Sequence, residues 1–283
     1  MASATVAGLR DAAAAGSAPF VAQQLLALFE QAAQEPDRVQ WVDRQIAANL
    51  RGTADPALAR ACTAVAVAID AQPATFDRLG YHNRQHFCEV ALTAYSLCLL
   101  ERLDAATTQL VVLAALLHDV VHEGRRSDPA FVQERASVAN MRPLLEGAGL
   151  AAPQIDRLMV LVLATDPSEG TAFMSATGRG RIPPAVPVDA PELAALVSDP
   201  ELARLARLLC EADVLPSIGL DAAHALRVQE RLSREWQRPL DPADKLVFMD
   251  FVLRQGYIGD FFLPCVHATR AALASGLDAA VQG

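Results

Sequence analysis

Apolar residues recur at three- and four-residue spacing along most of the chain, and long alternating runs of β-branched residues are missing. This periodicity is typical of helices that bury one face, and Ala and Leu, which dominate the sequence, are strong helix formers. The pattern therefore predicts an all-α protein. We expect helices over residues 19–34, 38–51, 56–71, 83–102, 105–122, 129–148, 152–165, 199–214, 221–237 and 242–278, the last broken near Gly256.

Two segments do not follow the helical pattern. Residues 1–18 are small and weakly patterned, and we expect a flexible N-terminal tail ahead of a single domain over 19–278. Residues 170–192 combine Gly, Pro and small side chains and are longer than an ordinary connection between helices, so we expect a mobile loop. It is either a lid over a site or a tolerated surface insertion.

Composition narrows the function classes. The chain has 283 residues, 52% of them hydrophobic, which is enough for a substantial core. Its net charge of -9 argues against a face that neutralises nucleic-acid phosphates. The five cysteines form no CxxC pair, the amino terminus lacks a secretory pattern, and no apolar run reaches the roughly 20 residues of a membrane span. We expect a cytoplasmic protein without nucleic-acid or membrane partners.

The stretch "HNRQH" places His82 and His86 four residues apart, which on a helix brings both imidazoles to one side. The pair by itself equally fits surface or capping histidines, and it lacks the glutamate of a zinc-protease motif.

A second stretch, "LAALLHDVVHEG", ends an apolar helical run in His118 and Asp119. Asp213 closes another apolar run in "LARLLCEADVLPSIG". Such groups are costly to bury unless they are paired or coordinated. His86, His118, Asp119 and Asp213 together form a mixed nitrogen and oxygen set that suits Zn, Mn, Fe or Mg. One or two divalent ions are expected, with Asp119 as the natural bridge.

The third apolar run, "LMVLVLATDPSEG", ends in Asp166 before a proline. This aspartate is either a helix stop and turn or a group that supports the metal site, and the residues favour neither.

These motifs, in this order, resemble the HD superfamily of metal-dependent phosphohydrolases, and within it the catalytic domain of class I cyclic-nucleotide phosphodiesterases. "YHNRQHFCEV", "HDVVHEG", "LATDPS", "EADVLPS" and "RQGYIGDFFLP" resemble five successive family stretches, and the likeness covers about residues 75–270. The resemblance implies a compact helical bundle of the HD-domain and phosphodiesterase type.

The resemblance also implies roles for individual residues. His82 is then the proton donor to the leaving oxygen, and His86, His118, Asp119 and Asp213 hold the first metal. Three further residues support bound waters, a second ion or the acid: His122, Asp166 and Glu134.

For the substrate, the resemblance points to Tyr257 as a stacking aromatic. The family's base-reading glutamine, three residues earlier, is replaced by Arg254, while Gln255 is displaced by one position. An arginine there favours an acidic or phosphate-bearing group. Arg125 and Arg126 are either rim contacts for an anionic substrate or solvated charges.

The expected function is hydrolysis of a small phosphoester, foremost a phosphodiester such as a cyclic nucleotide, by metal-activated water and a histidine acid. The expected partner is a small phosphorylated substrate of nucleotide type. The sequence is also compatible with a homodimer. The alternatives are a nucleotide phosphomonoesterase, a non-hydrolytic ligand-binding protein on the same scaffold, and a di-iron oxygenase, for which His122 is the extra ligand.

Overall fold

The structure is a computed structural model that describes residues 4–50, 52–178 and 184–282. Within these ranges it is entirely helical, without a strand, so the prediction of an all-α fold is confirmed. The helices are α1 (Val6–Ala14), α2 (Ala18–Gln34), α3 (Arg38–Asn49), α4 (Pro56–Asp70), α5 (Pro73–Phe76), α6 (Arg84–Leu100), α7 (Ala105–Leu117), α8 (Val132–Gly147), α9 (Ala152–Leu163), α10 (Gly170–Gly178), η1 (Pro191–Ala194), α11 (Ala195–Ser198), α12 (Pro200–Ile218), α13 (Ala222–Glu235), α14 (Pro242–Gln255) and α15 (Leu263–Gln282).

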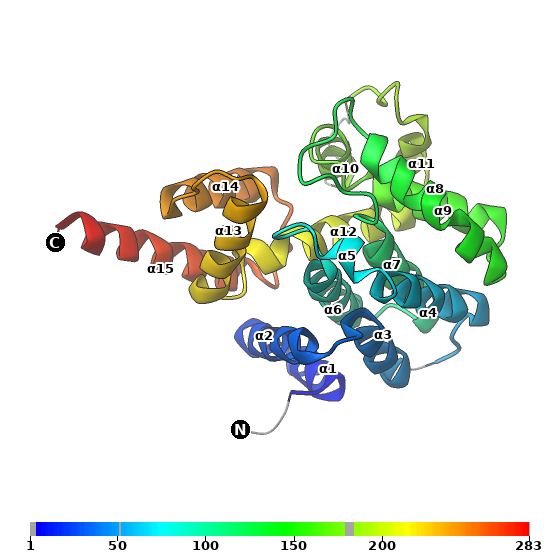
Figure 1. Cartoon of the computed structure of the whole chain (residues 1–283), viewed down its shortest axis with the longest axis horizontal. Helices are drawn as coiled ribbons and strands as arrows, with labels where there is room; N and C mark the ends of the chain where they lie inside the picture. The colour runs from blue at the N-terminus through cyan, green and yellow to red at the C-terminus, as the bar shows by residue number, and fades with distance from the viewer. Residues whose placement is uncertain (1–3, 51, 179–183, 283) are drawn as a thin grey trace.

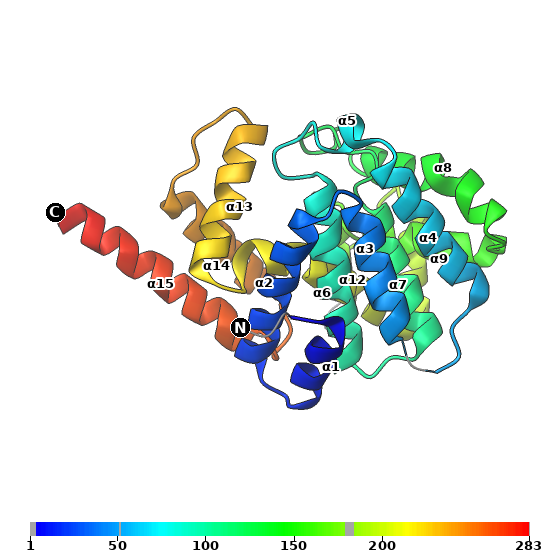
Figure 2. The same ribbon diagram turned by 60° about the horizontal axis from the view of Figure 1, so that its bottom comes forward.

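Helix α6 lies at the centre of the bundle and is buried on nearly every side. It packs against α2, α3, α7 and α12, and one continuous cluster of buried apolar side chains runs through these helices. Helices α13, α14 and α15 lie together on one side of this body, and α12 leads into them (Figure 1, Figure 2). A helix without a polar face suits this central position.

The break expected near Gly256 is present. Gly256 caps α14 in the left-handed conformation, with a φ of 62°, where a side chain would be strained. Other helix ends differ from the expected positions by a few residues. Helix α7 ends at Leu117 instead of residue 122, and α12 continues to Ile218 instead of ending at residue 214.

The prediction of a flexible tail is wrong for residues 6–14, which form α1. The side chain of Thr5 accepts a hydrogen bond from the backbone N–H of Gly8, and Val6, Leu9 and Ala12 are buried. Only three or so apolar positions are needed for a helix this short, and that is too few to give a clear period in the sequence.

The prediction of a loop over 170–192 is wrong at its start, because residues 170–178 form α10 with Phe173 and Met174 buried. Its centre, residues 179–183, lies outside the described residues. None of the helices, over the ranges described, is long and apolar enough to cross a membrane.

Candidate metal and catalytic site

The first histidine motif is split by the start of α6. Asn83 is the N-cap, and its side-chain oxygen accepts hydrogen bonds from the backbone N–H groups of Gln85 and His86 at 3.0 and 3.3 Å. His86 therefore lies in the first turn of α6, whereas His82 precedes the helix. The expectation that both histidines share one helical face is wrong, although their rings lie only 5.4 Å apart.

The second motif lies where α7 ends. His118 is the C-cap residue, and its Nδ1 lies 2.8 Å from the carbonyl oxygen of Ala115, which leaves Nε2 facing inward. Because the helix stops at Leu117, Asp119 belongs to the following turn and is not held to a helical direction. Asp213 comes from the second half of α12.

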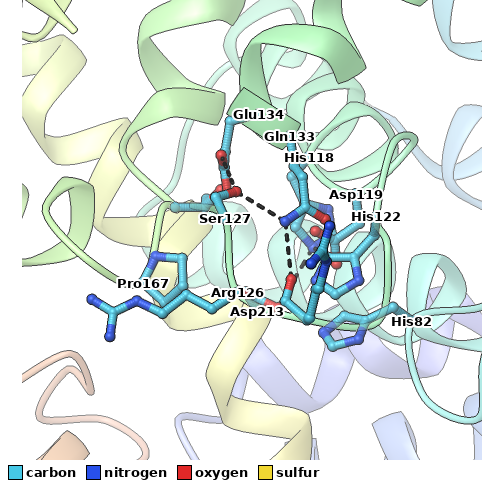
Figure 3. Close-up of a pocket in the computed structure, with 12 residues that line it drawn as sticks. His82, His118, Asp119, His122, Arg126, Ser127, Gln133, Glu134, Pro167 and Asp213 are labelled. Carbon is cyan, nitrogen blue, oxygen red and sulfur yellow. Dashed lines mark hydrogen bonds and ion pairs between the residues drawn. The ribbon is translucent and has the colours of Figure 1, made fainter. Parts of the chain in front are cut away.

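The structure brings these four residues to one point. His86 Nε2 lies 3.2 Å from Asp119 Oδ2 and 3.2 Å from Asp213 Oδ1. His118 Nε2 lies 3.1 and 3.5 Å from the same two oxygens, and the two Nε2 atoms are 3.2 Å apart. Figure 3 shows His118, Asp119 and Asp213 pointing toward one another at the centre of the pocket.

This spacing fits a divalent ion. Ligands at about 2.1 Å from an ion and at right angles to one another lie about 3.0 Å apart. Two imidazoles and two carboxylates are ligands that Zn, Mn, Fe and Mg accept. No Lys or Arg forms an ion pair with Asp119 or Asp213 within the described residues. These four residues would therefore hold such an ion.

The charges of the cluster depend on one another. Burial opposes a charge on each group, but the neighbouring carboxylates outweigh it and raise the pKa of both His86 and His118. In turn the two histidines keep the pKa of the Asp119 and Asp213 carboxyls low, against the effect of burial. The raised pKa values favour the protonated rings, whereas an imidazole that ligates an ion is neutral.

His82 lies beside the cluster with a different partner. Its Nδ1 is 2.5 Å from Oε1 of Glu235, at the end of α13. The other oxygen, Oε2, accepts hydrogen bonds from the backbone N–H groups of Tyr81 and His82 at 2.8 and 2.9 Å. Burial raises the pKa of the Glu235 carboxyl, but these contacts and the His82 charge lower it to about 2. His82 is thereby oriented, and its Nε2 forms no hydrogen bond to the residues that the structure describes.

Glu235 was not predicted from the sequence. It is one of several charged residues in "RVQERLSREW", and nothing in that stretch separates it from the exposed face of a helix. Only the fold shows that its side chain is fully buried and reaches across to His82.

His122 stacks on His82, with ring centres 3.7 Å apart and planes at 21°. Its Nδ1 accepts a hydrogen bond from the backbone N–H of Gly124. Burial lowers the pKa of His122 to about 4, although the Asp119 charge works the other way. A neutral His122 can lie against His82 without adding a second positive charge.

Asp166 and Glu134 differ in position. Both oxygens of Asp166 accept backbone N–H groups, from Phe131 at 3.1 Å and from Ser168 and Glu169 at 2.8 Å. Asp166 thus caps the turn that follows α9 and joins it to the start of α8, and it is not among the residues that line the pocket drawn in Figure 3. Glu134 does line that pocket; burial raises its pKa to about 7, and Ser127 donates a hydrogen bond to it at 3.2 Å.

The pocket drawn in Figure 3 has a volume of about 130 Å³ and shares several lining residues with a larger cavity of about 720 Å³. The cavity is bounded by α12, α13, α14 and the turns after Tyr81, His122 and Thr165. Tyr257 and Arg254 line it, as do Arg125 and Arg126. Gln255 does not, and its carbonyl oxygen accepts a hydrogen bond from Ser175.

No family model matches the chain, and no curated protein matches it. Solved structures do. The phosphodiesterase domain of the RhoPDE fusion protein from the choanoflagellate Salpingoeca rosetta superposes with a TM-score of 0.59 at 18% identity, over 93% of this chain and 92% of that one.

A second structure of the Salpingoeca rosetta rhodopsin phosphodiesterase domain gives a TM-score of 0.56 at 19% identity, over 77% and 82% of the two chains. LmjPDEB1, solved in complex with IBMX, gives 0.55 at 18% identity, over 89% and 88%. The chain thus shares the helical fold of phosphodiesterase domains along most of its length.

Proposed function

We propose that the protein is a metal-dependent phosphohydrolase of the HD and phosphodiesterase type that cleaves a small phosphodiester. The observation that carries the proposal is the meeting of four ligating side chains at 3.1–3.5 Å, with His82 next to them but bound to a different carboxylate. The fold it shares with phosphodiesterase domains supports the proposal.

A divalent ion, or a pair of them, held by His86, His118, Asp119 and Asp213 would supply activated water for attack on phosphorus and would neutralise charge on the phosphoryl oxygens. The two sides of this cluster differ in solvent exposure. The His86 and His118 rings are buried, whereas the carboxylates of Asp119 and Asp213 remain partly exposed toward the pocket. Substrate therefore approaches from the carboxylate side.

His82 is the proton donor in this proposal. Its Nδ1 faces Glu235, so Nε2 is the nitrogen that delivers a proton to the departing oxygen. The buried carboxylate of Glu235 stabilises the doubly protonated ring and fixes its direction. A well-placed acid of this kind contributes on the order of 10²–10⁴-fold to the rate.

The cavity beside the site has the size of a small-molecule pocket, since such pockets typically enclose about 300–1,000 Å³. Its lining includes Tyr257, Phe248 and Phe251, and also Arg254. Arg254 is exposed and forms no ion pair in the described part of the chain. An anionic group on the substrate would find a partner there.

The proposal is tested by turnover of bis(p-nitrophenyl) phosphate by purified protein loaded in turn with Mn²⁺, Mg²⁺ and Zn²⁺. We expect hydrolysis with at least one ion and its loss in Asp119→Ala. Absence of turnover with every ion, across cyclic nucleotides and phosphomonoesters as well, would overturn the proposal. Tightly bound iron together with an optical band that responds to oxygen would favour the oxygenase alternative instead.

A further inference from the structure

The inner wall of the large cavity contains polar side chains that the proposed chemistry does not use. Ser217 of α12, Gln229 of α13 and Lys245 of α14 all line it, and all three are buried. The same cavity is lined by apolar side chains, including Leu232 and Phe248, and by several charged ones, including Asp244. A few polar groups within an apolar pocket are what fixes the orientation of a ligand.

Gln229 has an unused hydrogen-bond acceptor. Its Nε2 donates to the carbonyl oxygen of Asp241, and this contact fixes which end of the amide is nitrogen. The opposite atom, Oε1, is buried and has no hydrogen-bond partner among the described residues. Buried acceptors without a donor are uncommon in folded proteins, so this oxygen is a candidate for contact with a ligand.

Lys245 has unused donors. It is the only lysine in the sequence, whose 24 Lys and Arg residues are otherwise all arginine, and it is only 3% exposed. Its Nζ donates to the carbonyl oxygen of Ser217 at 3.0 Å, and it forms no ion pair with a carboxylate in the described ranges. Two of its three N–H groups therefore remain for a ligand. Burial lowers the pKa of Lys245 to about 8, which leaves the ammonium protonated at pH 7.

Gln229 and Lys245 are neighbours in the wall of the cavity. The carbonyl oxygen of Asp241 accepts from the Gln229 side chain and also from the backbone N–H of Lys245 at 3.4 Å. Ser217, which binds the lysine, follows the metal-binding Asp213 by four residues on α12, or about 6 Å of helix. A sugar-sized spacer attached to the reacting phosphate would span this length of α12.

We propose that Gln229 and Lys245 recognise the hydrogen-bonding edge of a nucleobase on the substrate. Gln229 Oε1 accepts from an N–H of the base, Lys245 Nζ donates to a neighbouring ring nitrogen or carbonyl oxygen, and the rings of Phe248 and Tyr257 border the same cavity. The inference rests on the proposed phosphohydrolase function and deepens it. Base recognition is thereby assigned to α13 and the start of α14, and not to Arg254 or Gln255.

The test compares ligands with and without a base, and needs no turnover. Metal-loaded protein is titrated calorimetrically with guanosine, adenosine and uridine 5′-monophosphates and with ribose 5-phosphate. We expect at least one nucleotide to bind about tenfold or more tightly than ribose 5-phosphate. That ratio should fall to near one in Gln229→Leu and in Lys245→Met, and it should stay at the wild-type value in Gln23→Leu, an exposed glutamine of α2.

Two results would overturn the inference: equal affinity for ribose 5-phosphate and every nucleotide in the wild type, or a base preference that survives in both variants. Gln229→Leu leaves the Lys245 contact to Ser217 intact, so the test stands even if Lys245→Met unfolds. Turnover of bis(p-nitrophenyl) phosphate by the wild type reports separately on the proposed function. Turnover without a base preference would sink the inference alone, and a base preference without any turnover would sink the hydrolase proposal alone.

Discussion

Helix α6 carries two buried polar groups three residues apart, and they are neutralised in different ways. Glu89 is 1% exposed, and its carboxylate accepts hydrogen bonds from Arg231 at 3.0 and 3.4 Å and from Gln85 at 3.2 Å. His86 instead faces Asp119 and Asp213, which have only histidines opposite them. The first cluster contains its own cation, whereas the second has two carboxylates and two titratable rings.

This difference separates a buried cluster that stabilises the fold from one that is a candidate binding site. A buried carboxylate with an arginine is complete when the chain folds, because charge and hydrogen bonds are both satisfied. The negative charge of a cluster with two carboxylates and two imidazoles is balanced either by protons on the rings or by a divalent ion. Only a divalent ion can bind all four groups at once. Variants of the two clusters should therefore differ in their effects on activity, metal binding and stability.

The largest effect is expected at the metal cluster. Asp119→Ala removes one of the four ligating groups, and we expect kcat to fall on the order of 10³-fold or more, with weaker metal binding. Steady-state kinetics and metal analysis of the same preparation check this. Asp189→Ala, at an exposed aspartate, is the control, and it should leave both measurements unchanged. Full activity in Asp119→Ala would remove Asp119 from the site.

The Glu89 cluster should respond in stability and not in metal content. Arg231→Met leaves Glu89 as a buried, unbalanced charge, and we expect the free energy of unfolding to fall by about 3 kcal/mol. The double variant Glu89→Leu with Arg231→Met should recover most of this loss, because neither charge remains. Urea unfolding measures both. Tight metal binding that depends on Glu89 would contradict the distinction between the clusters.

A variant of Glu235 tests the proposed proton transfer from His82. Glu235→Gln keeps a hydrogen-bonding group beside His82 but removes the negative charge, and we expect kcat to fall about 10²-fold while metal content stays unchanged. If Glu235 only held the fold, its replacement would lower stability without altering the pH profile of kcat. A shift in the acidic or the basic limb of the pH profile of kcat would show that Glu235 acts on the proton donor. An unchanged profile with lower stability would indicate a structural role.

The smallest effect concerns protons. Because the pKa values of His86 and His118 are raised in the metal-free protein, an incoming ion must displace protons. Metal affinity should therefore rise with pH through the neutral range, by about tenfold per pH unit for each proton released. Titrations in buffers of different ionisation enthalpy count the protons. Affinity that does not change with pH would mean that the histidines are neutral before the ion binds.

Much of the fold was predictable because helical periodicity is a local property of the sequence. The central helices and the break at Gly256 follow from apolar spacing and a glycine cap. The ends of helices were less predictable: α7 stops at Leu117, although the helical spacing of apolar residues is continued by Val120 and Val121. That early stop turns Asp119 toward His86, and tertiary contacts decide it.

The proposed metal ligands could be singled out in the sequence for a related reason. A histidine or aspartate at the end of an apolar run is costly to bury, and this cost marks His118, Asp119 and Asp213 without knowledge of the fold. Glu235, Gln229 and Lys245 carry no such mark. All three lie on helices with ordinary polar faces. Gln229 and Lys245 become buried when α12, α13 and α14 come together, and the Glu235 side chain becomes buried against the turn that holds Tyr81 and His82.

The most direct test of the central claim is an anomalous-difference map from crystals of the protein grown with Mn²⁺. We predict a peak at about 2.0–2.4 Å from Nε2 of both His86 and His118 and from carboxylate oxygens of Asp119 and Asp213, with His82 outside its coordination shell. No peak at this position, or a peak held by His82, His122 and Glu235, would contradict the account.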